Sequence, residues 1–518
     1  MLNSANPREH ERISSIALLL LSAAALWCVC WFIHSWHYWE DDSYIHLEFA
    51  RSLATGHGFA FNGRVVAGDT APLWVFLLVA FHAILPKWLI AGKVLTVVGA
   101  IFGLSGIYAF ARSLARDLLP SIPDNGLVPA ALIVFILANP YTCYWIFSGM
   151  EPIAAAGLAC FALLAATRPR PGTRNFLIAC LLVGLAPLLR PEMLFLSALL
   201  AFPLISQARR LSSNDFAARI AGIILACTPV VLWSLYSLHV FGHLLPNTDA
   251  AKRAAPGHSV PLHLLTIYSF GLPLILAGFI VGIAYLVLRP ASVRHSIRTA
   301  LTSFFTGSRE NSNSLPLAGW IFILWSAITT VFYIANHTYV QTRYILVTAP
   351  GLTIIILILA LRASRRAGHI AYGAGFVAAL VVTLFSAWPF VRNKGLNCEA
   401  ADQIARYLHD HLPPDAPVAV YSIGEISFVS EHPIIDTGGI TRPDAIPYLN
   451  APAAMLEWAH SQGAQYFIGD KPEPDAVLVY NGQQRFATWS IHPSRYNTAI
   501  PIQLWRLSST PRTSNAIP

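Results

Sequence analysis

Long apolar runs alternate along the chain with short polar segments in which arginine is frequent. Most runs approach the length, about 20 residues, that crosses a hydrocarbon core as a helix. The clearest runs span 16–33, 94–111, 220–238, 272–288, 345–361 and 370–390. Further runs lie at 127–138, 153–166, 176–188, 193–205 and 317–334. The pattern predicts an all-α polytopic membrane protein with about eleven transmembrane helices.

Composition supports this class of protein. Hydrophobic residues make up 55% of the 518 residues and charged residues 12%, whereas a soluble globular protein carries about 25% charged residues. The run at 16–33 follows a short basic tail, as the core of a signal peptide would. Aromatic residues follow at 36–39, where a small-residue cleavage site would stand. We therefore predict a retained membrane helix with an aromatic belt.

The distribution of arginine predicts the topology. The net charge is +8, but the arginines lie between apolar runs, as in cytoplasmic loops, so no nucleic-acid partner is expected. Placing Arg8 and Arg12 inside also places the later arginine clusters inside. These clusters lie near 112–116, 168–174, 209–219, 289–309 and 362–366. The N-terminus is then cytoplasmic, and the apolar segment 71–85 is too short to cross the membrane.

This topology divides the chain into two domains. Residues 1–391 form the transmembrane domain, with a first external loop at 38–91. Residues 392–518 form a small C-terminal α/β domain, which is expected on the periplasmic side of a bacterial inner membrane. Periodicity predicts its helices at 398–412 and 443–462 and its strands at 417–423, 465–468 and 502–507. Residues 508–518 are predicted to be disordered.

Acidic residues are scarce in the transmembrane domain, and most lie on its expected outer face. They are Glu40, Asp41, Asp42, Glu48, Asp69, Glu151, Glu192 and Asp249. A carboxylate cluster beside a membrane is costly unless it is solvated, paired or bound to a cation. A divalent cation, Mg²⁺ or Ca²⁺, is therefore one alternative for residues 40–42, and a solvated loop is another. The seven cysteines show no spacing typical of a disulfide framework or a zinc site.

The first external loop carries a series of short motifs. It contains DDSYI at 41–45, GHGFAFN at 56–62 and GDTAPLW at 68–74. Later pieces are SGME at 148–151, FGHLLPNTDAAK at 241–252 and RY at 343–344. The series resembles the GT-C superfamily of glycosyltransferases. More narrowly, it resembles the mycobacterial terminal arabinofuranosyltransferases and their bacterial relatives.

The resemblance implies an enzyme that takes a sugar from a polyprenyl-phosphate donor, with arabinofuranose favoured by the nearest relatives. Asp41 would act as base on the acceptor hydroxyl, with Asp42 beside it. A donor phosphate needs fixed cations at the outer ends of spans, where the topology places Arg190, Lys252 and Arg343. The other candidates for binding substrate are Tyr44, Arg51, Glu151, Asn247, His337 and Tyr344.

Other functions stay open. A transporter or flippase of lipid-linked glycans needs polar residues along a path through the spans, and the apolar runs contain almost no ionisable residues. An O-antigen ligase or polymerase would share a large external loop, but the acidic pair directly after the first span favours the GT-C interpretation. A non-catalytic scaffold leaves the charged outer residues unexplained. The acceptor, whether envelope glycan, glycolipid or protein, and retention or inversion are not specified by the sequence.

Overall fold

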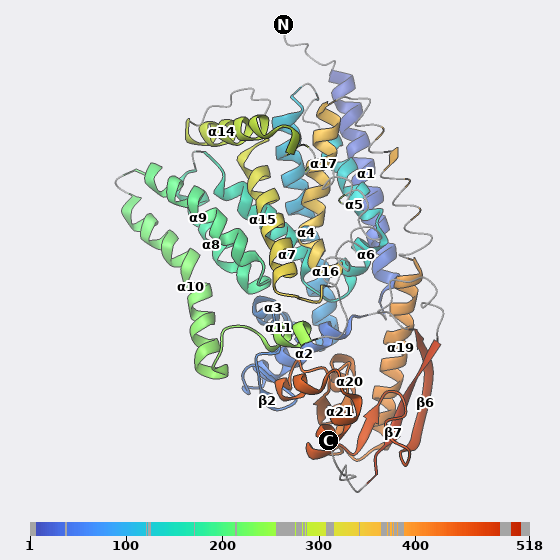
Figure 1. Ribbon diagram of the computed structural model, residues 1–518. Helices are drawn as coiled ribbons and strands as arrows, with labels where there is room; N and C mark the ends of the chain where they lie inside the picture. Colours follow the sequence, from blue (N-terminus) through green and yellow to red (C-terminus); the bar gives the residue numbers. More distant parts are fainter. Residues whose placement is uncertain are drawn as a thin grey trace.

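A bundle of helices with a small sheet at one end makes up the protein (Figure 1). The computed structural model describes residues 7–36, 39–120, 122, 126–169, 171–212, 215–254, 289–306, 315–340, 342–363, 388–486 and 499–508, with scattered positions in 275–288 and 370–381. The N-terminal end of the first helix lies at the end of the bundle opposite the sheet.

Several of the described helices are long and apolar enough to cross a membrane. Four meet that condition alone: α1 (Pro7–His34), α4 (Trp88–Leu118), α10 (Phe216–Phe241) and α15 (Leu317–Ala335). A bent pair, α5 (Leu127–Leu137) and α6 (Pro140–Phe147), meets it only when joined, with an angle of 87°. Shorter apolar helices complete the bundle: α7 (Pro152–Ala166), α8 (Thr173–Leu189) and α17 (Ala349–Ala363). The chain is therefore a multi-pass membrane protein.

The predicted spans agree with these helices wherever the structure describes them. The run at 193–205, for example, lies within α9 (Met193–Arg210), and the run at 345–361 overlaps α17. The predicted spans 272–288 and 370–390 lie outside the described residues, apart from scattered positions. Most of the tail that was predicted to be disordered, 509–518, also lies outside them.

Glycines let α4 and α7 approach each other closely. A Cβ added at Gly106 would overlap the carbonyl oxygen of Gly157, and one added at Gly103 would overlap that of Ile153. Small residues permit such backbone contact in a membrane, where dispersion forces rather than water exclusion hold helices together. This contact fixes the start of α7, and with it the preceding residue Glu151.

The first external loop folds against the end of this bundle. It consists of α2 (Asp41–Ala54), the hairpin β1 (Ala60–Phe61) and β2 (Arg64–Val65), and α3 (Pro72–His82). The 11 residues of α3 span only about 16 Å at 1.5 Å per residue. That length falls short of the hydrocarbon core, which is about 30 Å thick. The helix therefore has the length of the non-crossing segment predicted at 71–85.

The C-terminal part is a five-stranded sheet with helices. The strand order is β4-β3-β5-β7-β6, in which β4, β3 and β5 are parallel and the last two strands are antiparallel to their neighbours. The strands are β3 (Val418–Val420), β4 (Ile434–Asp436), β5 (Tyr466–Ile468), β6 (Val477–Phe486) and β7 (Ala499–Arg506). The helices are α19 (Trp388–His411), α20 (Gly424–Ser430), the 3₁₀ helix η3 (Pro443–Tyr448) and α21 (Pro452–Ser461).

Sequence patterns located part of this sheet. The predicted strands at 417–423, 465–468 and 502–507 overlap β3, β5 and β7, whereas β4, β6 and α20 were not predicted. Strand β4 has only three residues, which is too short to show a period. The Asn-Gly sequence at 481–482 inside β6 is typical of a turn. In the structure it lies where the register of β6 against β7 shifts.

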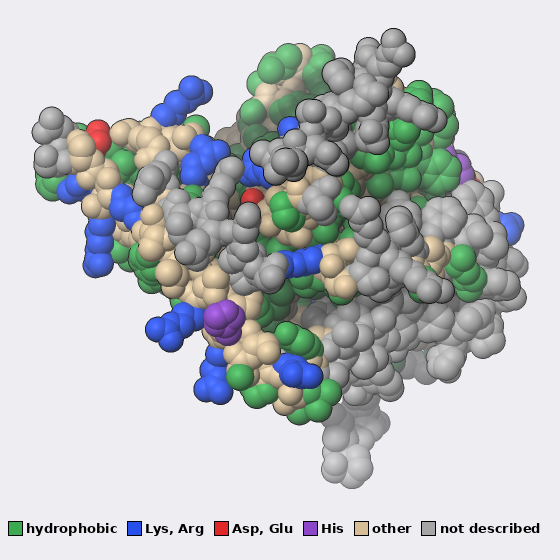
Figure 2. Space-filling model, turned by 90° about the horizontal axis from the view of Figure 1, so that it is seen from above, with side chains coloured by type: hydrophobic (Ala, Val, Ile, Leu, Met, Phe, Trp, Pro, Cys, Tyr) green, Lys and Arg blue, Asp and Glu red, His purple; other side chains and the backbone are tan. Residues whose placement is uncertain are grey.

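One end of the bundle carries a group of exposed basic side chains. Seen from the end where α1 begins, Lys and Arg side chains gather over the region of α9, α10 and α14 (Pro290–Thr306) (Figure 2). Arg209, Arg294 and Arg298 are among the exposed ones. The loop helix α2 and the C-terminal sheet lie at the opposite end (Figure 1).

The close contact of α4 and α7 gives a test of this packing. Gly106→Ala should destabilise the protein by about 1–3 kcal/mol, because the new methyl group forces the two backbones apart. Gly172→Ala is the matched control, because a Cβ at Gly172 meets nothing within 4 Å. Thermal unfolding of both variants in the same detergent would measure the difference. Equal melting temperatures would contradict the packing.

Candidate active site

Two adjacent carboxylates, Asp41 and Asp42, open helix α2. Glu40 precedes them at the N-cap, is buried, and accepts a hydrogen bond of 2.5 Å from the hydroxyl of Tyr144. The side chains of Asp41 and Asp42 are partly exposed. Three consecutive acids at one helix start repel each other, so their surroundings decide which of them holds a proton.

Asp41 lies against the C-terminal part of the chain. Its Oδ1 accepts a hydrogen bond of 3.0 Å from the backbone N–H of Glu425. Burial and the neighbouring charge of Asp42 raise the pKa of Asp41 to about 7. A carboxylate that titrates near neutral pH is suited to accept a proton in a reaction.

The pKa of Asp42 is shifted in the opposite direction to that of Asp41. Burial disfavours its charge, but the guanidinium of Arg343, with which it forms an ion pair, and the ammonium of Lys252 together lower the pKa of Asp42. The two neighbouring acids therefore titrate in different ranges. Of the two acids, Asp41 is therefore the better candidate for a residue that accepts a proton.

Arg343 has hydrogen-bond donors that its ion pair with Asp42 does not use. Its side chain is 3% exposed, and its Nη2 donates to Asp42. The other two nitrogens, Nε and Nη1, are buried without a hydrogen-bond partner in the described part of the chain. Buried unsatisfied donors are costly, so a guanidinium with free donors indicates a place for an acceptor such as a phosphate oxygen.

Further positive charge surrounds the phenol of Tyr344 on α16 (Thr342–Leu346). Lys252 on α11 (Asn247–Ala254) donates a hydrogen bond to its hydroxyl, and the guanidinium of Arg190 lies 4.8 Å from its ring. Burial would raise the pKa of Tyr344, but Lys252, Arg343 and Arg190 outweigh it and lower the pKa. The lowered pKa shows that this position favours negative charge.

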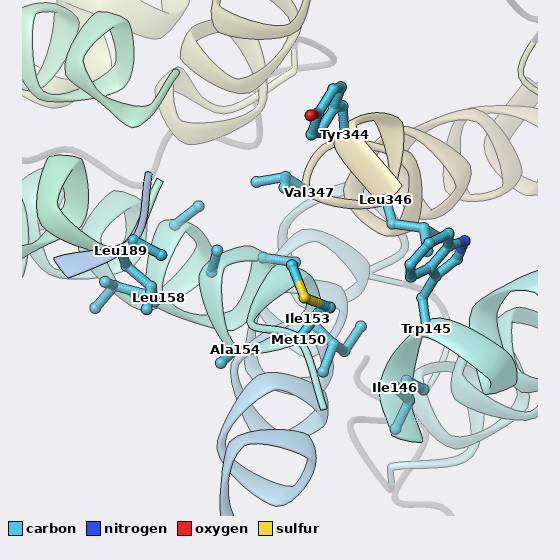
Figure 3. Close-up of a cluster of buried hydrophobic side chains, with 14 of the residues drawn as sticks. Trp145, Ile146, Met150, Ile153, Ala154, Leu158, Leu189, Tyr344, Leu346 and Val347 are labelled. Carbon is cyan, nitrogen blue, oxygen red and sulfur yellow. The ribbon is translucent and has the colours of Figure 1, made fainter. Parts of the chain in front are cut away.

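Apolar contacts hold Tyr344 and its neighbours in place. Figure 3 shows Leu346, two residues after Tyr344, beside Trp145 of α6, with Tyr344 at the edge of the cluster. These side chains are nearly completely buried. The α16 segment, which includes Arg343, is therefore anchored on the bundle by packing, which fixes Arg343 opposite Asp42.

Arg190 differs from Lys252 and Arg343, the other two predicted phosphate ligands, because its guanidinium already forms ion pairs with two carboxylates. Its Nη1 lies 2.7 Å from Glu151 and its Nε 2.7 Å from Glu192. All three side chains are almost completely buried. An arginine with two carboxylate partners carries little net charge toward a ligand. Arg343 and Lys252 are therefore the better cations for a donor phosphate.

His46 joins this network to the first external loop. Its Nδ1 lies 2.5 Å from Asp69 and its Nε2 lies 3.4 Å from Glu151. Burial would lower the pKa of His46, but the two carboxylates raise it to about 10. The same contacts hold the pKa of Glu151 below its usual range, although burial acts against this. A charged His46 therefore bridges two segments.

The charge pattern of the sequence places Asp69 and Glu192 on the outer face, but no role was predicted for them or for His46. His46 stands four residues after Asp42, which places both on one face of α2. That spacing is the one signal that could have found it. Its partners come from other segments, so their pairing is not visible in the sequence.

The remaining predicted residues have different surroundings. Tyr44 is buried between the rings of Trp39 and Phe428, at 5.9 and 5.8 Å. Asn247 is also buried, and its backbone N–H donates to the carbonyl of Ala67. His337 is exposed in a left-handed conformation with φ of 51°, and among the described residues it makes no hydrogen bond or ion pair with Asp41 or Asp42.

Arg51 lies at an ion pair between two parts of the chain. Its guanidinium contacts Glu48 at 2.6 Å and Glu431 at 2.9 Å and lies over the ring of Phe428. These contacts connect α2 to α20 and the residue that follows it. The role of Arg51 that the structure supports is to hold these helices together, while its predicted role in binding substrate stays a prediction.

A metal site can be assessed only from side chains. Within the described ranges, no group of three or more His, Cys, Asp and Glu side chains is placed to hold a metal ion. The described partners of the carboxylates are protein cations: Arg343 for Asp42, His46 for Asp69 and Arg190 for Glu151. The prediction of a divalent cation stays untested.

Comparison with known proteins identifies the fold. The structure is similar to two solved structures of ArnT from Cupriavidus metallidurans. The one bound to undecaprenyl phosphate has a TM-score of 0.53 at 12% identity, covering 95% of this chain and 98% of that one. The apo structure has a TM-score of 0.51 at 13% identity, covering 95% and 97%. The chain therefore has an ArnT-like GT-C fold, as the sequence predicted.

Sequence comparisons add one match. Residues 391–513 match a family described as a domain of unknown function, DUF8728. No curated protein matches the sequence. The structural neighbours share the fold of this chain but do not support the narrower resemblance to mycobacterial arabinofuranosyltransferases.

The charge on His46 gives a test of the buried network. An unfolded histidine has a pKa of about 6.5, whereas the folded pKa is raised to about 10. The stabilisation from this proton is fully present below pH 6.5 and is lost as the pH rises through the folded pKa. Between pH 7.5 and 9.5, roughly, the unfolding free energy should fall with a slope of up to about 1.4 kcal/mol per pH unit.

Denaturation of wild type and His46→Asn in detergent across this range would measure the slope. The difference isolates His46, because both proteins contain the same cysteines and lysines. His57→Asn, a change at an exposed histidine, should retain the wild-type slope. The same slope in His46→Asn as in wild type would show that His46 is not charged in the folded state.

Proposed function

We propose that this chain is a membrane glycosyltransferase that transfers a sugar from a polyprenyl-phosphate donor to an acceptor of the bacterial envelope. The observation that supports it most is that Asp41, whose pKa is raised to about 7, stands next to Asp42, whose ion-pair partner Arg343 has buried donors without a hydrogen-bond partner in the described part of the chain. A base and an anion site side by side are what this transfer requires. The likeness to ArnT bound to undecaprenyl phosphate is consistent with this substrate class.

The reaction assigns one role to each side of the site. The acceptor hydroxyl oxygen attacks the anomeric carbon, and Asp41 takes the hydroxyl proton. The bond between the anomeric carbon and the phosphate oxygen breaks, and the polyprenyl phosphate leaves with that electron pair. Arg343 and Lys252 stabilise the charge that develops on the leaving phosphate. Asp42 stays ionised and holds Arg343 in position.

The location of the phosphate follows from the charges. Lys252 and Arg343 both approach the hydroxyl end of Tyr344, where the lowered pKa of the phenol indicates a positive potential. A phosphate offers several acceptor oxygens to these donors, and arginine matches its geometry through a planar fork. The phenol hydroxyl can donate to the same group.

We propose that the site faces the periplasm. A group of exposed arginines, among them Arg209, Arg294 and Arg298, lies at the opposite end of the bundle (Figures 1 and 2), and such residues are enriched on the cytoplasmic side of membrane proteins. This orientation places the N-terminus inside, and the C-terminal part outside the inner membrane. Lipid-linked donors would then be used after transfer to the outer leaflet. The sugar and the acceptor are not assigned; arabinofuranose stays a prediction from the loop motif alone.

Turnover should depend on the protonation of Asp41. The rate should rise with pH and reach half of its maximum near pH 7, because only the ionised carboxylate accepts the proton. Asp41→Asn should lose about 10²–10⁴ in rate. Asp444→Asn, at an exposed carboxylate of the C-terminal part, is the control. Release of polyprenyl phosphate by purified protein is the measurement. Near-normal turnover of Asp41→Asn would remove this assignment.

Arg343 should govern donor binding. Arg343→Ala should weaken binding of undecaprenyl phosphate roughly 10- to 100-fold, since a charge-assisted contact contributes about 1.5–3 kcal/mol. Arg343→Lys should recover only part, because lysine lacks the planar fork. Arg209→Ala, at the opposite end of the bundle, should bind normally. Titration of the lipid into purified protein measures the affinities, and unchanged affinity in Arg343→Ala would move the phosphate site elsewhere.

A further inference from the structure

The C-terminal part of the chain touches the proposed base directly. The N–H of Glu425 donates to Oδ1 of Asp41 over 3.0 Å, and the N–H of Gly424 acts on the same carboxylate. A Cβ added at Gly424 would overlap the backbone carbonyl oxygen of Asp41. Only a glycine allows α20 to approach α2 this closely. The contact joins residues 384 positions apart in the sequence.

Contacts along both helices hold this approach in register. Arg51 pairs with Glu431 at the far end of α20. Beyond α2, the amide of Asn62 donates to the hydroxyl of Ser427 at 2.8 Å and to the carbonyl of His432 at 3.1 Å. The first external loop therefore contacts α20 and the residues that follow it through an ion pair and two hydrogen bonds. These contacts fix the position of the Glu425 N–H relative to Asp41.

We propose that the C-terminal domain completes the active site by orienting the base: the backbone N–H of Glu425 holds the Asp41 carboxylate in its reactive position. Glu425 is in this sense a positioning residue that acts through its main chain. The inference rests on the proposed function, because it concerns how Asp41 works in the transfer. It also gives a role to the part of the chain that matches a domain of unknown function.

The N–H of Glu425 is available because of its place in α20. The amide of Ser427 donates to the carbonyl of Ile423, so the amides before it have no partner within the helix. A hydrogen bond to the ionised form of a carboxylate favours that form. The amide therefore opposes the burial that raises the pKa of Asp41. Without it, Asp41 would ionise only at higher pH.

The charged groups around Asp41 set the background for this effect. Glu40 and Asp42 lie on its own helix and raise its pKa. Arg343 and Lys252 act on the adjacent Asp42, as does His46. On the side of α20, the Glu425 carboxyl is buried, and burial, Asp41 and Asp402 raise its pKa well above the usual range. Both substitutions at position 425 remove this carboxyl group, so any charge that it carries is absent from both variants.

Two substitutions at position 425 separate the amide from the side chain. Glu425→Pro removes the N–H and the carboxyl group, and proline is tolerated in the first turn of a helix. Glu425→Ala removes only the carboxyl group and is the matched control. The measurement is the pH profile of donor turnover for both purified variants. Glu425→Pro should shift the midpoint upward by about one to two pH units relative to Glu425→Ala, with activity returning at high pH.

A purely structural defect would lower the rate at every pH without moving the midpoint. Identical midpoints in the two variants would overturn the inference, even when Asp41→Asn is inactive and the proposed function stands. If Asp41→Asn keeps normal turnover, the proposed function itself fails. These two results are therefore distinguishable.

A second measurement does not depend on the folding of Glu425→Pro. Hydrogen exchange of the 424–426 amides is followed in the full chain carrying Asp41→Ala or Asp41→Asn. Asparagine keeps an oxygen that accepts from the Glu425 N–H, whereas alanine has none. Exchange should be faster in Asp41→Ala than in Asp41→Asn. Equal exchange in both would contradict the hydrogen bond on which the inference depends.

Discussion

The ion pair between Asp42 and Arg343 determines how the rest of the site works. It joins α2 to a segment 301 residues later and keeps Asp42 ionised. The repulsion between the two adjacent acids therefore falls on Asp41, whose pKa rises to about 7. The two nitrogens of Arg343 outside this hydrogen bond, Nε and Nη1, have no hydrogen-bond partner within the described part of the chain. One contact thus separates the pKa values of the two acids and fixes the position of a buried guanidinium beside them.

The other buried charges hold this pair in place. Arg190 is held between Glu151 and Glu192, and His46 bridges Glu151 and Asp69. Removing one member of such a network leaves an uncompensated buried charge, which typically costs about 3–5 kcal/mol. The network therefore stabilises the segments only when it is complete. This explains why Arg190 and Arg343, which look alike in the sequence, have different roles.

Local patterns predicted the apolar helices and three of the strands, because hydrophobic periodicity is a property of neighbouring residues. The acidic pair was also visible, since it follows directly on an apolar run. The partners of His46 were not, because Asp69 and Glu151 come from separate segments. Arg51 was predicted to bind substrate, yet its contacts with Glu48 and Glu431 depend on a helix, α20, that no pattern in the sequence indicated.

The structure is similar to ArnT although only 12% of the residues are identical. The helix bundle and the contact between Gly424 and Asp41 differ in how strictly they constrain the sequence. Membrane-facing apolar side chains can replace one another as long as volume and pattern are kept, so the bundle tolerates wide divergence. The contact of Gly424 with Asp41 has no such freedom, because any Cβ there would overlap the loop backbone. The part of the chain that carries Gly424 and Glu425 provides an amide that donates to Asp41. This contact therefore exists only where the two parts of the chain meet.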